Sequence, residues 1–168
     1  MPVYSRLACL GLACVFAAPA GAQLLNQKSL STDMALTIAQ TALETCTKQG
    51  FNVSVTVVGR TGEVLVQVRG DNASPHTVEN SFRKAYTART FRTSTADFTK
   101  RMLKPGEPPG ALTTLPNVIA NAGALPIKVG DEVIGGVGVS GVPGGNPANA
   151  SDEACAKAGL DKVADQLK

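Results

Sequence analysis

The sequence lacks most of the short motifs by which enzymes and metal sites are recognised. It has one histidine, His76, among 168 residues, and it contains no C-x-x-C, H-E-x-x-H or G-x-S-x-G pattern. These absences argue against dithiol and zinc-peptidase sites. A Ser-His-Asp triad could use only His76, and no serine occupies a recognisable nucleophile elbow, so a hydrolase is disfavoured.

The sequence also lacks an apolar run of the length that a bilayer span needs, about 20 residues. Its longest apolar run, LACLGLACVFAA, follows Arg6 and precedes small residues at Ala20 and Ala22. This order predicts a secretory signal peptide over residues 1–22, cleaved after Ala22. The mature domain over 23–168 is then expected in the periplasm or outside the cell, without membrane insertion.

Little net charge is left once the signal peptide is removed. Residues 1–22 carry Arg6 and no acid, so the 16 basic residues fall to 15, against 13 acidic residues. A balance this close to neutral argues against a general nucleic-acid partner.

The four cysteines divide into two pairs. Cys9 and Cys14 lie inside the apolar run and leave with the signal peptide, although a lipoprotein anchor at either is a weaker alternative. Cys46 and Cys155 remain, and an oxidising compartment favours a disulfide between them. The alternative is two buried free thiols, which behave as small hydrophobic side chains.

Hydrophobic periodicity predicts a single α+β domain. Apolar residues at helical spacing alternate along the chain with valine-rich runs of period two, and turn residues separate them. The predicted order is helix, hairpin, two helices, hairpin and helix, over 31–50, 53–68, 74–92, 94–103, 124–141 and 151–168. Hairpins imply an antiparallel sheet. A Cys46–Cys155 bond would hold the first and last helices together on one face.

The stretch GVGVSG, residues 136–141, matches the pattern G-x-G-x-x-G. A dinucleotide site is not expected, because that motif should follow a strand and open a helix directly. Here the glycines lie inside the predicted second strand of a hairpin. A strand so rich in glycine leaves room for another backbone or for a ligand.

His76 falls in the first turn of a helix that we expect Ser74 to cap. The positive end of a helix disfavours an imidazolium, and the neutral ring is the form that binds a metal. Between residues 83 and 104 seven basic residues face one acid, Asp97. A neutral imidazole beside a basic surface suits a ligand with a metal centre and carboxylate arms, namely haem. The alternative is an exposed histidine on an ordinary solvated helix.

The residues predicted to bind haem are His76, Arg83, Lys84, Tyr86 and Arg92. His76 would be an axial iron ligand through Nε2 or Nδ1. Either Arg83 with Lys84, or Arg92, would pair with the propionates. Tyr86 would line the pocket or pack in the core. Met102 is a candidate second ligand, although a thioether at helical spacing is more often core. The glycine-rich strand and the loop over 104–114 would form the walls.

A second hypothesis requires no haem. A small organic acid or other anionic metabolite could bind at the start of the second short helix. The residues assigned to that anion site are Thr87, Arg92, Thr93, Ser94 and Thr95. A third hypothesis is enzymatic haem degradation, for which the sequence offers no recognisable catalytic base, so no catalytic residue is assigned.

Four stretches carry a likeness to a known family. They are VSVTVVGRTGEVLVQVRGD, RKAYTARTFRTST, VIGGVGVSG and DEACAKAGL, in one unbroken order. KAYTA followed by ST, and then GVGVSG before an acidic helix start, is a specific combination. Over residues 29–167 the sequence resembles the haem-binding GlcG/HbpS-like family.

The resemblance implies an antiparallel sheet of about five strands between helices, in a profilin-like layout. It also implies homo-oligomers, and haem binding as in several members. Some exported members are linked to haem or iron sensing beside a membrane-bound sensor, whereas others belong to glycolate or diol operons. Fold alone does not decide function, so our first hypothesis is an exported haem-binding protein in sensing, storage or transfer.

Overall fold

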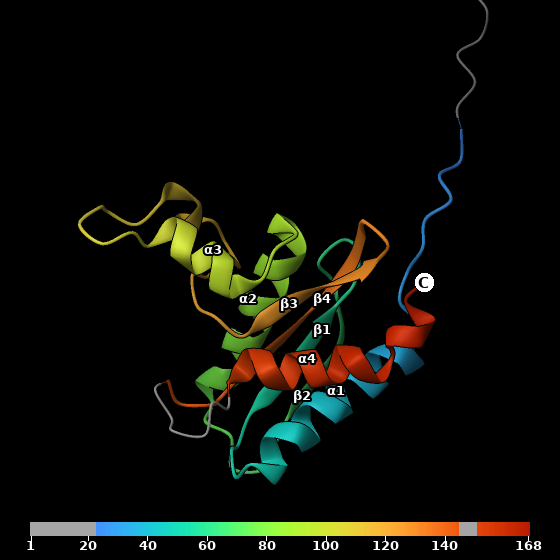
Figure 1. Ribbon diagram of the computed structural model, residues 1–168, viewed down its shortest axis with the longest axis horizontal. Helices are drawn as coiled ribbons and strands as arrows, with labels where there is room; N and C mark the ends of the chain where they lie inside the picture. Colours follow the sequence, from blue (N-terminus) through green and yellow to red (C-terminus); the bar gives the residue numbers. More distant parts are fainter. Residues whose placement is uncertain (1–22, 145–150) are drawn as a thin grey trace, which may run out of the picture.

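The computed structural model describes residues 23–144 and 151–168, so the predicted signal peptide lies outside the described residues. Figure 1 shows an antiparallel sheet with helices on both of its faces. The helices are α1 (Thr32–Lys48), α2 (His76–Phe91), α3 (Thr95–Met102) and α4 (Asp152–Lys162), with short 3-10 turns η1 (Ala111–Thr114) and η2 (Ala164–Gln166). The strands are β1 (Ser54–Val58), β2 (Val64–Arg69), β3 (Ala124–Val129) and β4 (Glu132–Ser140).

The sheet is built from the two predicted hairpins, β1–β2 and β3–β4. Its strand order is β2-β1-β4-β3, and each neighbouring pair is antiparallel. Pairing of β1 with β4, with Ser54 opposite Ser140, joins the hairpins. The α+β class is therefore confirmed. The described residues form four strands, where about five were expected.

One face of the sheet is covered by α1 and α4, which lie side by side (Figure 1). The apolar stripe of α1, from Ala35 to Cys46, is fully buried against the sheet and α4. A Cβ on Gly159 of α4 would lie 2.5 Å from the carbonyl oxygen of Ile38, so glycine allows the two helix backbones to approach closely. The predicted Cys46–Cys155 disulfide is present, with 5.7 Å between the Cα atoms.

The other face is covered by α2, whose backbone lies directly on β4. A Cβ on Gly138 would lie 2.3 Å from the carbonyl oxygen of Ser81, and one on Gly136 would lie 2.5 Å from that of Ala85. The glycine-rich strand therefore makes room for another backbone. The sequence had left open whether that room would take a backbone or a ligand. The hydroxyl pair Thr56–Ser81, at 2.8 Å, joins the sheet to the same helix.

Capping explains three of the four helix starts. Ser31, Ser94 and Ser151 accept hydrogen bonds from backbone amides three residues later. The expected Ser74 side-chain cap is wrong, because no side-chain hydrogen bond caps the start of α2. The Ser74 carbonyl instead accepts from the amide and hydroxyl of Thr77.

Candidate functional site

His76 is the first residue of α2, and its side chain is exposed. A groove of about 450 Å³ lies between α2 and the edge strand β2. The groove is lined by Val64, Gln67, Pro75, Val78, Glu79 and Phe82. His76 follows the lining residue Pro75 in the chain but does not itself line this mostly apolar groove, which also contains one carboxylate.

Arg83 lies two helical turns beyond His76 on nearly the same side of α2, a rise of about 10 Å. Its guanidinium donates to the carbonyl oxygen of Val118 over 2.8 Å and lies 3.6 Å from the Glu79 carboxylate. The side chain is 31% exposed. Among the predicted cations, Arg83 is the one that shares the His76 end of the helix and still reaches the surface.

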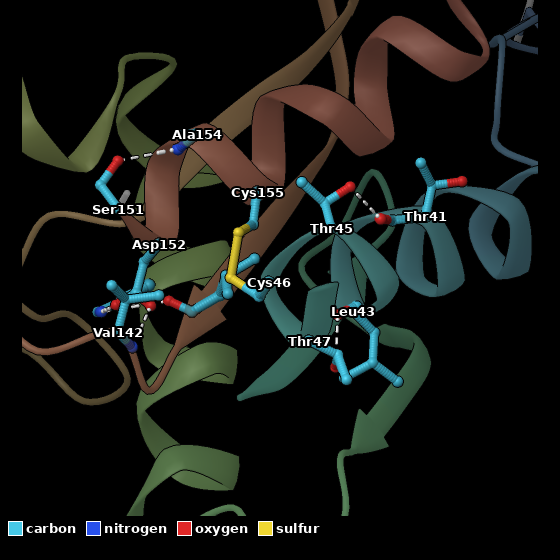
Figure 2. The surroundings of a disulfide bond; sticks show 12 residues. Thr41, Leu43, Thr45, Cys46, Thr47, Val142, Ser151, Asp152, Ala154 and Cys155 are labelled. Carbon is cyan, nitrogen blue, oxygen red and sulfur yellow. Dashed lines mark hydrogen bonds and ion pairs between the residues drawn. A yellow bond between two sulfur atoms is a disulfide. The ribbon is translucent and has the colours of Figure 1, made fainter. Parts of the chain in front are cut away.

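Lys84 is not a surface cation. Its Nζ lies 2.7 Å from Asp152 Oδ2 and 3.2 Å from the Val139 carbonyl oxygen, and its side chain is 3% exposed. Asp152 also accepts from the Val142 amide, beside the disulfide (Figure 2). Burial raises the pKa of Asp152, although Lys84 opposes that shift. Lys84 therefore ties α2 to α4 and offers no charge to a ligand at the surface.

Arg92 and Tyr86 lie towards the other end of α2. Arg92 is the C-terminal cap, and a helix of this length places it about 24 Å from His76 along the axis. That rise is longer than the reach from a haem iron to its own propionates, so we do not group Arg92 with His76. The Tyr86 ring contacts Phe82, with 5.9 Å between centroids, and packs on Gly62 of the β1–β2 turn.

Met102 packs its sulfur against Gly110, and no contact joins it to His76 in the described residues. The loop over 104–114 is mostly exposed and includes η1. The structure therefore places neither the candidate second ligand nor the expected wall against the groove between α2 and β2.

The hydroxyls assigned to the anion site are largely used inside the protein. Thr87 Oγ1 accepts from the Ile119 amide and Thr95 Oγ1 from the Ala124 amide, each at 2.9 Å. Ser94 caps α3 through the Asp97 amide. Arg92 is exposed and Thr93 is half-buried. The hydroxyls of Thr87, Ser94 and Thr95 thus already have hydrogen-bond partners within the protein.

A basic corner that the sequence interpretation did not single out lies around Arg89. Burial first, and then the charges of Arg92 and Arg60, lower the pKa of Arg89. Burial opposes but does not outweigh the Thr61 hydrogen bonds that lower the pKa of Glu63 beside it. Arg60 comes from a turn far away in sequence, so only the pairing of β1 with β2 could have indicated this cluster.

Metal-binding clusters and membrane-spanning helices are both absent from the described residues. Within residues 23–144 and 151–168, no three histidine, cysteine or acidic side chains gather as a metal site. No helix in the same ranges is both long and apolar enough for a membrane span.

The donor set beside His76 fits one face of a haem. It provides an imidazole, aliphatic and aromatic side chains suited to a porphyrin face, and the Arg83 guanidinium suited to a propionate. Arg92, Lys84 and Met102 are not part of this set, for the reasons of distance, burial and packing given above.

The fold and the site define a small α+β domain that presents one imidazole at the start of a helix packed on its sheet. A family model described as "Haem degrading protein HbpS-like" matches residues 30–161, and the chain belongs to this HbpS-like family. The predicted family resemblance is thus confirmed.

Two kinds of relative agree with this assignment. The chain is 32% identical over 111 residues to Protein GlcG of Escherichia coli strain K12, covering 66% of this chain and 81% of GlcG. The crystal structure of an HbpS double mutant from Streptomyces reticuli is 34% identical, with a TM-score of 0.73, and the match covers 86% of this chain and 96% of that one. Protein ORFY of Klebsiella pneumoniae is 26% identical, with a TM-score of 0.70 over 84% of this chain and 98% of ORFY.

Proposed function

We propose that the protein binds haem at the N-terminal half of α2, with His76 as an axial ligand. The observation that carries this proposal is the exposed position of the chain's one histidine at the start of α2, directly after Pro75, which lines an apolar groove. The family description, which concerns haem, supports the choice of ligand. Bound iron would accept the imidazole lone pair.

The chain's own residues then have separate tasks. Val64, Val78 and Phe82 would cover one porphyrin face and exclude water from it. Arg83 would exchange its long contact with Glu79 for a propionate, a charge-assisted hydrogen bond. We propose neither Lys84 nor Arg92 as a propionate partner.

We further propose that the protein is exported and acts in haem or iron sensing, storage or transfer. The sequence of residues 1–22 supports export, and the Cys46–Cys155 disulfide is typical of an oxidising compartment. The family resemblance supports a homo-oligomer and a membrane-bound sensor or haem-transfer partner as the protein's associates.

Hemin titration followed at the Soret band tests the site. We expect a saturable Soret shift in the wild type and a roughly tenfold or larger loss of affinity in His76→Ala, because one coordinate bond is removed. His76 has no hydrogen-bond partner among the described residues, so this substitution should leave the fold intact. Lys162→Gln, an exposed change at the end of α4, is the control.

Arg83→Gln tests the propionate contact separately from the ligation of iron by His76. It should weaken hemin binding several-fold while the spectrum of the bound form stays that of a histidine complex. An identical Soret spectrum and affinity in His76→Ala would remove His76 from the site and overturn the proposal.

A further inference from the structure

The C-terminal half of α2 meets the β1–β2 turn at one corner of the fold. A Cβ on Gly62 would lie 2.7 Å from the Tyr86 ring, and one on Gly136 would lie 3.2 Å from the Arg89 amide. The first approach packs α2 against the turn that carries Arg60, and the second packs its last turns against β4. The corner therefore brings together residues from two distant parts of the chain.

Three guanidinium groups gather at this corner, from Arg60, Arg89 and Arg92. Arg60 is held firmly, because it lies 2.8 Å from Glu132 and donates through Nε to the Lys28 carbonyl oxygen over 2.9 Å. Arg89 is half-buried, and Arg92 is exposed at the helix end. The charges of Arg60 and Arg92 both act on Arg89.

The acidic residues of this corner make their direct contacts with other groups, although the charge of Glu63 also acts on Arg89. Glu132 pairs with Arg60, and Glu63 Oε2 accepts from the Thr61 amide at 2.8 Å and from its hydroxyl at 2.6 Å. Among the described residues no carboxylate lies within 4.0 Å of Arg89 or Arg92. Arg89 Nε is shielded from solvent and has no hydrogen-bond acceptor there. A partly dehydrated cation thus stands near two other arginines and near the Glu63 carboxylate, without a direct ion pair of its own among the described residues.

The backbone at Arg92 adds a second observation. Arg92 has a φ of 56°, a left-handed conformation that favours glycine at the end of a helix. Holding another residue there costs about 1–3 kcal/mol, and such strain concentrates at ligand sites. Attraction between cations and the negative helix end contributes only about 0.3–1 kcal/mol. The attraction of cations to the helix end alone therefore does not explain why three arginines lie close together here.

We propose that Arg89 and Arg92 bind an oxyanion, a carboxylate or a phosphate group, in the positive field of Arg60. Guanidinium groups suit such ligands because their paired N–H donors match two oxygens at once. The terminal amino groups of Arg89 and Arg92 make the contacts, while Arg60 stays paired with Glu132.

The oxyanion site is separate from the proposed haem site. Arg89 lies about 20 Å from His76 along the helix axis. Each site can therefore fail without the other, and variants at one serve as controls for the other.

Titration of the ¹⁵N-labelled protein with malonate and with phosphate tests the proposal, at constant ionic strength set with chloride. We expect saturable shifts of the Arg89 and Arg92 Nε–H signals. The anion that saturates these shifts at the lower concentration identifies the ligand class, carboxylate for malonate or phosphate for phosphate. Shifts that never saturate, or that chloride reproduces, would overturn the site.

Variants locate the binding. Arg89→Gln should lower affinity roughly tenfold or more, the loss expected for a hydrogen bond to a charged group. Lys162→Gln removes the same charge on α4 and should change nothing, as should His76→Ala. Equal losses in Arg89→Gln and Lys162→Gln would show that only net charge matters and would refute the proposal. The wild-type Nε–H signals decide the matter even if Arg89→Gln folds poorly.

Discussion

The two faces of the sheet are held by different kinds of contact. Between the sheet and the α1–α4 pair the contacts are mainly apolar, and the Cys46–Cys155 bond joins the two helices to each other. Between the sheet and α2 they are hydroxyl pairs, Ser54–Thr77 at 2.7 Å and Thr56–Ser81 at 2.8 Å, with backbone packed on glycine.

The difference bears on function, because both proposed sites lie on α2. Apolar contacts are non-directional and tolerate small shifts of a helix, whereas buried hydrogen bonds hold one register. The polar face therefore fixes where His76 and Arg89 stand at the two ends of α2. The apolar face supplies stability, and its disulfide supplies the register that apolar contacts leave open.

The largest loss of stability is expected from removing Asp152, whose ion pair with Lys84 links α4 on one face of the sheet to α2 on the other. Asp152→Ala leaves the buried Lys84 charge without its partner, so we expect a loss of about 3–5 kcal/mol in the free energy of unfolding. Urea denaturation at neutral pH measures it. Adding Lys84→Met should restore much of the loss, because no buried charge remains. A loss below about 1 kcal/mol in the single variant would mean that water replaces the carboxylate.

Removing the disulfide should destabilise mainly the α1–α4 face. We expect Cys46→Ala with Cys155→Ala to lose about 2–5 kcal/mol, since the bond closes a loop of 109 residues. Hydrogen exchange should accelerate more in α1 and α4 than in α2. The chemically reduced wild type is the control, and equal acceleration in all three helices would contradict the difference between the faces.

The elements of the fold were predictable because their signals are local. Caps at Ser31, Ser94 and Ser151, alternating valines and the spacing of apolar residues act within a few positions. The Ser74 side-chain cap did not form, because the Thr77 amide donates to the Ser74 carbonyl oxygen instead of to its hydroxyl.

The site was less predictable because its contacts are distant in sequence. Lys84 looked like a free surface cation until the fold brought Asp152, 68 residues away, to it. Thr87 and Thr95 looked free until Ile119, in the segment before β3, and Ala124, the first residue of β3, supplied amides to them. The separation of His76 from Arg92 follows from helix geometry alone, and the sequence interpretation overlooked it.

The smallest expected effect concerns Glu153, which links α4 to the start of α3. Its Oε2 is buried without a hydrogen-bond partner in the described residues, although the Ala96 amide favours the charged form of the carboxylate. Burial first, and then the charge of Asp97, raise the pKa of Glu153 above its ordinary value of 4.5, with Lys100 opposing. The folded state therefore keeps this proton to a higher pH than the unfolded state does.

A raised carboxyl pKa makes stability fall as pH rises. Below pH 4.5 both states are protonated, and the loss accumulates from there until the folded carboxyl has titrated. Glu153→Gln keeps an acceptor for the Ala96 amide and removes the charge. It should therefore flatten the decline and stabilise the protein at neutral pH by at most about 1 kcal/mol, since the group is partly exposed. Urea midpoints between pH 4 and pH 8 measure this difference. Glu107→Gln, an exposed change, should keep the wild-type decline. If stability falls with pH in parallel in Glu153→Gln and the wild type, Glu153 ionises in the folded protein without penalty. Water would then reach its carboxylate at the contact between α3 and α4.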